Sequence, residues 1–316
     1  MHAPTAAPPR PSATTWHRPP ALTAIPARRF LPGDHISPGL LACDPLTTGD
    51  WTERWLAWSA SHWSRVVVEL PRDERMEDLR AVRRLAREGR TLRRLSHPSV
   101  PRLLEDRHDH PVPHLVLEHA EGLTLDQVLL TGGPLPPAEV VQVGIRLASC
   151  LHHVHGRGFA HLGLEPAGVA VRDGHTTLLD FGAARPVGGS PPPGRPRCAV
   201  YQAPERCLRG RPDPRMDLFS LGAVLYELAT GQPAFRAEEV VPGCAHPQLL
   251  VAPARARSVR AGVPVDLDAV IHVLLERDPR RRPRTALEAL RLLASALPGG
   301  AARTWPSFAD RLLDVD

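Results

Sequence analysis

The first third of the chain carries short apolar and β-branched runs separated by polar residues, a pattern typical of strands. We predict these strands at 40–43, 54–59, 65–70 and 114–118. A longer stretch, 76–95, predicts one helix, which ends at a His-Pro pair. This part of the chain should form a small sheet with one helix packed on it.

From residue 123 onward the apolar pattern becomes that of helices. Residues 136–155 are apolar enough for a largely buried helix. Residues 217–230 are apolar on nearly every face but too short to cross a bilayer, so we expect them in a core. Two strands and two further helices complete the prediction: 169–172, 177–179, 267–275 and 285–297. A small β-rich part followed by a larger helical part predicts an α+β fold.

Both ends of the chain differ from this pattern. Residues 1–33 are rich in Pro and Ala and have little apolar periodicity, so we expect a disordered or extended tail. A proline-motif ligand is the alternative. Residues 298–316 form a C-terminal tail in which Trp305 and Phe308 could dock as part of a short amphipathic helix or could fray.

The chain contains no Lys and no Asn, so all 39 of its basic side chains are Arg. Any chemistry that needs a lysine ammonium or an Asn metal ligand is therefore excluded. The 34 acidic residues and the basic ones are spread along the whole chain, with a formal net charge of +5. Such a mixed surface argues against a nucleic-acid partner.

The five cysteines are scattered and form no C-x-x-C pair, which is typical of reduced thiols. No run of apolar residues approaches the length of a membrane helix or the core of a signal peptide. We expect a soluble cytoplasmic protein with no membrane partner.

Several motifs follow one another in a fixed order. Asp180-Phe181-Gly182 comes after a strand, Ala203-Pro204-Glu205 follows it, and a D-P-x-x-R-P sequence spans 278–283. In this order and spacing they resemble the eukaryotic-type Ser/Thr protein kinases of bacteria, over roughly residues 40–297. The resemblance implies a bilobal kinase-like fold, with an N-lobe at 34–119 and a C-lobe at 120–297.

The residues that the resemblance assigns to architecture are present. Glu205 and Arg282 would form a mostly buried ion pair, and Asp217 would hold the backbone of the catalytic loop. His161, Phe181 and Gly182 occupy the other structural positions of the family. The scaffold should therefore be intact.

The catalytic positions differ from the family pattern. Gly163 stands where the family has the Asp that accepts the substrate proton, and Gly168 stands where it has the Asn that binds the second magnesium. The two family lysines are replaced by Glu69 and Glu165. Leu162 replaces the Arg on which a phosphorylated activation loop docks. No catalytic set is intact.

The resemblance assigns six further residues to a nucleotide pocket: Gly49, Glu88, Leu117, Glu118, Ala120 and Asp180. Asp180 would be the metal ligand of this pocket. The cofactor that such a pocket would allow is ATP with Mg²⁺. Glu69, Glu88 and Asp180 would converge there if the small-lobe helix lies inward. Facing carboxylates repel unless one of them is protonated, a cation or an Arg side chain lies between them, or the helix swings outward over a collapsed pocket.

Four tryptophans between 51 and 63 should pack on the small sheet, although their spacing also partly suits a helix. Trp51, at the tip of the former Gly-rich loop, could instead plug the nucleotide site. A group of histidines fits no zinc pattern and is predicted to lie in an exposed turn: His108, His110, His114 and His119.

These observations predict a pseudokinase, a kinase-shaped scaffold or allosteric regulator whose partner is a protein, such as an active kinase. The alternative is a divergent Ser/Thr kinase or another ATP-dependent transferase, and a third reading is a nucleotide sensor without turnover. Intact Asp180-Phe181-Gly182 is the feature that keeps these alternatives open.

Overall fold

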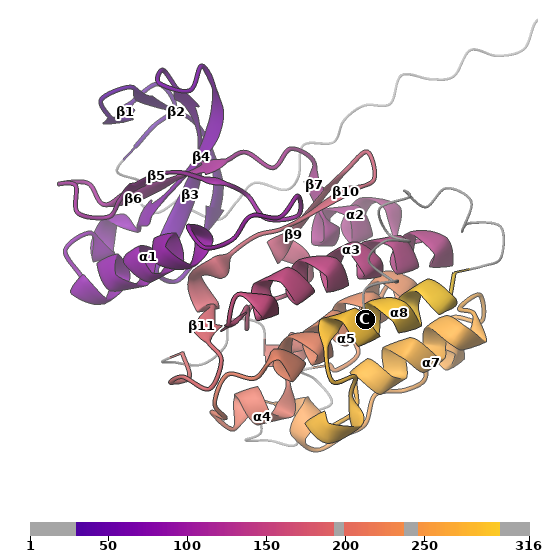
Figure 1. Cartoon of the computed structure of the whole chain (residues 1–316). Coiled ribbons are helices and arrows are strands. Elements are labelled where there is room, and N and C mark those ends of the chain that lie inside the picture. Colours follow the sequence, from indigo (N-terminus) through magenta and orange to yellow (C-terminus); the bar gives the residue numbers. More distant parts are fainter. Residues whose placement is uncertain (1–29, 193–198, 237–245, 298–316) are drawn as a thin grey trace, which may run out of the picture.

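A six-stranded antiparallel sheet forms the small lobe of the computed structural model, which describes residues 30–192, 199–236 and 246–297 (Figure 1). The strand order is β1-β2-β3-β4-β6-β5. The strands are β1 (His35–Ser37), β2 (Leu40–Thr48), β3 (Thr52–Ser59), β4 (Ser64–Pro71), β5 (Leu103–Arg107) and β6 (His114–Glu118). All four strands predicted here are present, whereas β1 and β5 were not predicted.

The tryptophan-rich stretch is a strand and a hairpin, so its partly helical spacing was misleading. Along β3 the side chains alternate between inside and outside: Trp55 is buried and packs edge-on against Phe30, while Trp58 is exposed. Trp58 meets the exposed Trp63 edge-to-face across the hairpin, with ring centroids 6.4 Å apart. The sheet pairing decides the structure of this segment.

The ordered small lobe begins earlier than the predicted boundary at residue 34. Phe30 is buried in the core on one face of the sheet, and the Gly33 amide donates to the Ala42 carbonyl. Residues 30–33 therefore belong with the sheet. The rest of the predicted 1–33 tail, and the predicted 298–316 tail, lie outside the described residues.

Helix α1 (Leu79–Leu92) lies against the sheet (Figure 1). It begins after Asp78, whose carboxylate accepts from the Arg80 amide as an N-cap, so the helix starts later than the predicted 76. The single 3₁₀ turn η1 (Asp73–Arg75) precedes it. Leu85 and Leu92 join a hydrophobic core that continues into the second lobe.

The large lobe is mainly helical. Helix α3 packs on both α5 and α8 and forms its centre (Figure 1). The helices are α2 (Leu125–Gly132), α3 (Pro137–Gly156), α4 (Pro204–Cys207), α5 (Pro214–Thr230), α6 (Ala256–Val259), α7 (Val265–Leu274) and α8 (Ala286–Ser295). The predicted α+β, two-lobed architecture is confirmed.

Short strands and 3₁₀ turns position the loops that face the small lobe. One small sheet has the order β10-β9-β7, and β8 pairs with β11. The strands are β7 (Leu123–Thr124), β8 (Phe159–Ala160), β9 (Val169–Arg172), β10 (His175–Leu178) and β11 (Arg185–Pro186). The 3₁₀ turns are η2 (Pro166–Gly168), η3 (Phe181–Ala183), η4 (Ala199–Tyr201), η6 (Pro247–Leu249) and η7 (Pro279–Arg281).

The ion pair implied for Glu205 and Arg282 is present. Two guanidinium nitrogens of Arg282 donate to the two carboxylate oxygens at 2.7 and 2.9 Å, and the Arg282 side chain is fully buried. Arg282 also donates to backbone carbonyls, including that of Arg215. This bidentate contact ties α4 to the segment that precedes α8.

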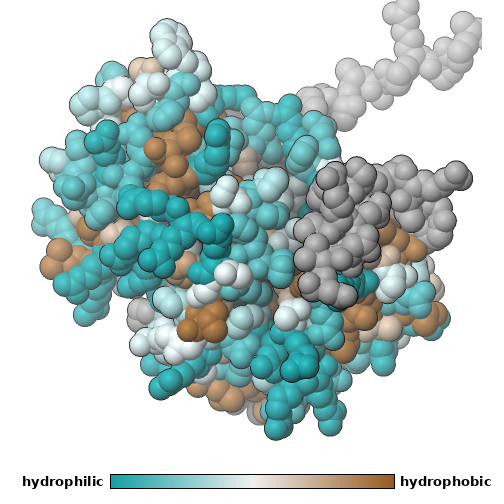
Figure 2. Space-filling model, viewed as in Figure 1, coloured by the Kyte–Doolittle hydropathy of each residue, from teal (hydrophilic) through white to brown (hydrophobic). Residues whose placement is uncertain are grey.

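The surface is mixed in character. On the face shown in Figure 2, hydrophilic residues predominate and hydrophobic residues gather in small separate patches. Scattered apolar residues of this kind are ordinary on folded proteins. Across the described part of the chain, no helix has the length and apolar character needed to span a bilayer.

Candidate functional site

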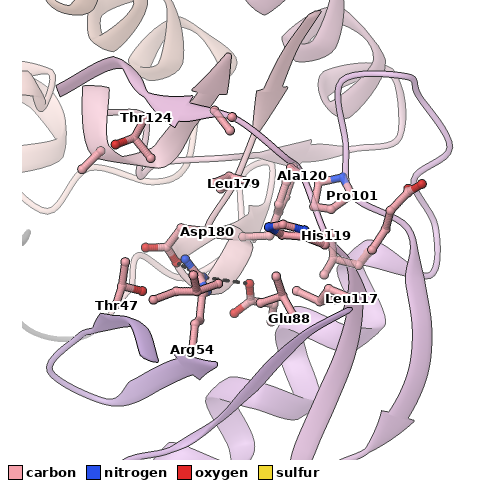
Figure 3. Close-up of a pocket in the computed structure, with 18 of the residues that line it drawn as sticks. Thr47, Arg54, Glu88, Pro101, Leu117, His119, Ala120, Thr124, Leu179 and Asp180 are labelled. Carbon is pink, nitrogen blue, oxygen red and sulfur yellow. Dashed lines mark ion pairs between the residues drawn. The ribbon is translucent and has the colours of Figure 1, made fainter. Parts of the chain in front are cut away.

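A cavity of about 420 Å³ lies between the two lobes, in the size range of small-molecule sites (Figure 3). Leu117 and Glu118 line it from the end of β6, and Ala120 lines it from the segment that connects β6 to the large lobe. Of the six predicted pocket residues, only Gly49 lies outside this lining. Gly49 lies in the β2–β3 turn instead, beside a much smaller hollow.

An arginine that the sequence interpretation did not single out fills the position of the expected cation. Arg54 on β3 is paired in register with Glu69 on β4, and its Nε donates to Glu69 Oε2 at 2.7 Å. Thr52 donates to the other Glu69 oxygen at 2.9 Å. Glu69, although 1% exposed, therefore has both carboxylate oxygens hydrogen-bonded.

The same guanidinium reaches two further carboxylates. Arg54 Nη2 lies 3.3 Å from Asp180 Oδ1 and 3.8 Å from Glu88 Oε1. The three side chains point toward one another in Figure 3. Arg84 on α1 is at the limit of an ion pair with Asp180, at 4.0 Å. Helix α1 lies inward, so the alternative of a swung-out helix over a collapsed pocket is wrong, and an Arg side chain separates the carboxylates.

The electrostatics of this group follow from its burial. Burial acts to lower the pKa of Arg54, but the carboxylates of Glu69, Asp180 and Glu88 together raise this pKa by more than burial lowers it. The guanidinium therefore stays charged. Burial and the nearby Glu69 raise the pKa of Glu88 well above its usual value, more than Arg54 lowers it. Three carboxylates thus share one close guanidinium.

Gly163, Glu165 and Gly168 lie in and beside η2, on the large-lobe side, and none of the three lines the cavity. A Cβ on Gly163 would lie 3.3 Å from the Cβ of Ala183, which is closer than most real contacts of this kind. A Cβ on Gly168 would meet nothing nearer than 3.8 Å. A side chain at position 163 would therefore need Ala183 to shift slightly, whereas one at position 168 would not need its neighbours to move.

The loop that precedes these residues keeps a constrained shape. Asp217 Oδ2 accepts from the His161 amide at 2.8 Å and Oδ1 from the Leu162 amide at 2.7 Å, as the resemblance implied. Asp217 Oδ2 also pairs with His155 Nε2 at 2.8 Å. Leu162 has φ of 60°, a left-handed conformation that strains a branched side chain and persists only where contacts enforce it.

The Asp180-Phe181-Gly182 segment is turned toward the small lobe. Phe181 is buried and meets the His161 ring edge-to-face, with centroids 4.8 Å apart, which fits their expected structural roles. Asp180 has φ of 59° and lines the cavity. A Cβ at position 182 would lie 2.6 Å from Arg84 Nη2 and 2.8 Å from Glu88 Oε2, so a side chain there would push the ends of these two side chains aside.

These residues do not suit the magnesium of the family. The Asp180 carboxylate that would bind the ion contacts the Arg54 guanidinium, and the second ligand position is Gly168, which has no side chain. Among the residues that the structure describes, no group of three or more His, Cys, Asp or Glu is placed to hold a metal ion. The predicted role of Asp180 as a metal ligand would require its contact with Arg54 to open.

The histidines and Trp51 take ordinary structural places. His108 Nδ1 contacts Asp106 at 2.6 Å, and His114 is buried with Nδ1 on the Val112 carbonyl, so the predicted exposed turn is only partly correct. The guanidinium of Arg75 lies over the Trp51 ring, with its central carbon 4.4 Å from the ring centroid. Trp51 does not line the large cavity, so it does not plug that space, but it borders the much smaller hollow that Arg54 and Asp180 also line.

Comparisons with known proteins agree with this architecture. The family model described as "Protein kinase domain" matches residues 60–292. Serine/threonine-protein kinase PknB of Mycobacterium leprae is 29% identical over 263 residues, covering 80% of this chain and 42% of the relative. The probable serine/threonine-protein kinase CPE1738 of Clostridium perfringens is 30% identical over 228 residues, covering 71% of this chain and 33% of the relative. The chain thus spans less than half the length of these curated relatives.

Solved structures show the same fold. The kinase domain of Mycobacterium tuberculosis PknI, as a single mutant, matches with a TM-score of 0.66 at 20% identity, covering 84% of this chain and 98% of that one. A double mutant of the same domain matches with a TM-score of 0.67, again at 20% identity, covering 85% of this chain and 99% of that one.

Proposed function

The chain belongs to the protein kinase family, and from this premise we propose that it is a pseudokinase that acts as a scaffold or allosteric regulator of a protein partner. The observation that carries the proposal is the Arg54 guanidinium, held among Glu69, Glu88 and Asp180. In an active kinase this volume holds a lysine that anchors phosphate.

The charge balance argues against binding of a nucleoside triphosphate. An active kinase offers a lysine to the phosphates here, paired with one glutamate. In this chain Arg54 is offset by Glu69 and faces two more carboxylates. Each unit of charge changed at ~5 Å from a phosphate is worth about 3 kcal/mol at an effective dielectric constant of about 20, before screening. Phosphate binding should therefore be weak.

The chemical step also lacks its groups. Gly163 offers no base to take the proton of a substrate hydroxyl, and Gly168 offers no metal ligand. The Ala183 methyl lies against the place from which a base at 163 would project. Weak phosphate binding and a missing base affect different stages of the reaction, so their effects on transfer combine.

The intact architecture supports a binding role. Helix α1 is held inward by Arg54, the His161–Phe181 contact is formed, and the Glu205–Arg282 pair is closed. Each of these contacts braces one lobe with the chain's own side chains, and the contact of Arg54 with Asp180 at 3.3 Å joins the two lobes. A kinase shape that is braced in this way suits a protein that regulates a partner.

A specific observation favours a second candidate, a divergent Ser/Thr kinase or another ATP-dependent transferase. The cavity between the lobes is open, and Asp180 lines it. If Arg54 turned toward the cavity, it would present a cation to phosphate while releasing Asp180. This candidate requires the Arg54 contacts to break when nucleotide binds.

Transfer of labelled phosphate separates the two candidates. The chain is incubated with labelled ATP and either Mg²⁺ or Mn²⁺, with a general acceptor protein present, and Asp180→Ala serves as the matched variant. We expect the same background signal from both. Transfer that Asp180→Ala abolishes would contradict the pseudokinase proposal and favour the transferase. Thermal shifts with ATP, with and without metal, report binding separately.

The place and partner of the chain are also proposals. Free thiols at Cys43, Cys150 and Cys207 support a reducing compartment, for which we propose the cytoplasm. The mixed surface charge supports a protein partner, such as an active kinase, rather than nucleic acid or a membrane. Affinity capture with the intact chain, compared with Arg282→Met as an architectural control, tests for such a partner.

A further inference from the structure

The cavity between the lobes has an apolar belt that suits a flat ring. Its apolar walls come from β2, β4, α1 and β6 of the small lobe and from β9 and the residue after β10 of the large lobe, so both lobes contribute (Figure 3). The apolar lining residues are Leu46, Val67, Leu92, Leu117, Ala170 and Leu179. Apolar walls with a few placed polar groups are the usual composition of a small-molecule site.

The charged groups of the cavity are unequal in sign. Among the described residues that line it, the carboxylates are Glu88, Glu118, Asp126 and Asp180, and the one arginine is Arg54. Arg54 is already engaged by Glu69, Glu88 and Asp180. Arg84 adds a second positive charge near Asp180, but it does not line the cavity. Glu118 is offset by Arg102, which lies 3.3 Å away outside the lining. Glu88, Asp126 and Asp180 still outnumber Arg54, so the lining has more carboxyl groups than guanidinium groups.

One acceptor in this lining lacks a donor. Glu88 is 1% exposed, and its Oε2 has no hydrogen-bond partner among the described residues. Its other oxygen has only the long contact with Arg54, at 3.8 Å. A buried acceptor without a donor is unfavourable, and a charged N–H donor would satisfy it most strongly.

We propose that this cavity binds a flat aromatic ligand carrying a cationic N–H group, an amidine or a protonated amine, in preference to a nucleoside triphosphate. The ring lies in the apolar belt and the cationic group faces Glu88 and Asp180. The inference rests on the proposed function, because it requires a pocket that no longer turns over ATP.

Two probes of the same shape and opposite charge test the proposal. Isothermal titration calorimetry of the full chain compares naphthalene-2-carboxamidine with naphthalene-2-carboxylate, and with ATP in the presence and absence of Mg²⁺. The amidine should bind at least about tenfold more tightly than the carboxylate or ATP. Equal or tighter binding of the carboxylate or of ATP would overturn the proposal.

Variants assign the binding to Glu88. Glu88→Gln should weaken amidine binding about tenfold, because a bound cation favours the ionised form of Glu88, whereas glutamine has a similar shape and cannot ionise. Glu105→Gln is the matched control: Glu105 lies in the same lobe, outside the cavity lining, and contacts Arg107 at 3.0 Å. It should leave the amidine affinity unchanged. An unchanged affinity in Glu88→Gln would refute the assignment.

A second variant keeps the test valid if Glu88→Gln fails to fold. Leu46 lines the cavity from β2 and is itself exposed, so Leu46→Arg should be tolerated and should place a positive charge at the mouth. It should weaken the amidine and strengthen the carboxylate. The phosphate-transfer assay is independent of these titrations, so absent transfer combined with absent amidine binding would refute this inference alone.

Discussion

Arg54 and Glu69 face each other on the neighbouring strands β3 and β4, and their side chains meet at 2.7 Å, with Glu69 at the position of the lysine in the family pattern. Relative to the family pattern, the cation of the site has moved from one strand to the next and has changed its partner. Because the chain has no lysine, an arginine from the opposite strand is what keeps Glu69 and Glu88 compatible with burial.

Arg54→Met should lower the free energy of unfolding by about 3–5 kcal/mol, since it leaves buried carboxylates without their partner. The double variant Arg54→Met with Glu69→Met should recover more than half of that loss, because an apolar pair can replace a buried ion pair. Chemical denaturation measures both.

The matched control for this pair is Arg65→Met. Arg65 lies on β4 in an exposed ion pair with Glu121, so its loss should change stability by less than about 1 kcal/mol. If Arg54→Met and Arg65→Met lowered the free energy of unfolding equally, the contacts of Arg54 with the buried carboxylates would stabilise the fold no more than an exposed ion pair does.

Arg282→Met should be among the most destabilising single changes in the large lobe, at about 3–5 kcal/mol, because it leaves the Glu205 carboxylate and several carbonyls without donors. Urea denaturation followed by circular dichroism measures the loss. The control is Arg280→Met, which removes an exposed guanidinium paired with Asp278 in the same segment and should leave the denaturation curve unchanged. A similar shift in both variants would contradict the architectural role of Arg282.

Restoring the two missing catalytic side chains should have unequal effects. Gly168→Asn has room and should change the free energy of unfolding by less than about 1 kcal/mol, whereas Gly163→Asp meets the Ala183 methyl and should lose about 1–3 kcal/mol. Adding Ala183→Gly to Gly163→Asp should recover part of that loss. Additive effects of these two changes in thermal or urea denaturation would show that the contact is unimportant.

Stability should fall as the solution becomes acidic, in part through His97. Burial and the neighbouring His153 lower the pKa of His97 from 6.5 to about 4. The folded chain therefore binds fewer protons than the unfolded chain between these values, so stability is lost as the pH falls through that window. Because the ring is only partly buried, the loss attributable to His97 between about pH 7 and about pH 5 is roughly 1 kcal/mol.

In His97→Gln, the loss of free energy of unfolding between about pH 7 and about pH 5 should be smaller by roughly 1 kcal/mol than in the parent chain. Chemical denaturation at the two pH values measures the difference. The fold of this variant can be checked at neutral pH, where the hydrogen bond between His97 Nε2 and Ser149 Oγ is the contact at risk. A variant with the same acid dependence as the parent chain would rule out this role of His97.

The motifs made the fold predictable because they are local in sequence. Asp180-Phe181-Gly182 and Glu205 identify the large lobe without knowledge of pairing, and the strand at 114–118 was predicted with its observed bounds. Strand β5 was missed because its sequence, Leu-Leu-Glu-Asp-Arg, lacks alternation and its residues are only partly buried. Its strand character comes from pairing with β6.

The candidate site was only partly predictable for a related reason. The sequence indicated that a cation or an arginine could separate Glu69, Glu88 and Asp180, but not which arginine among 39. Choosing Arg54 requires the register of the β3–β4 hairpin, which places it directly opposite Glu69. That both residues fall in adjacent predicted strands was the available signal.

The methyl group of Ala183 beside Gly163 has an evolutionary consequence. An aspartate introduced at position 163 would require Ala183 to shift by a few tenths of an ångström, so a glycine at position 183 would make that change easier to accept. The order of the two substitutions would therefore matter, because a change at position 183 that comes first avoids the more tightly packed intermediate.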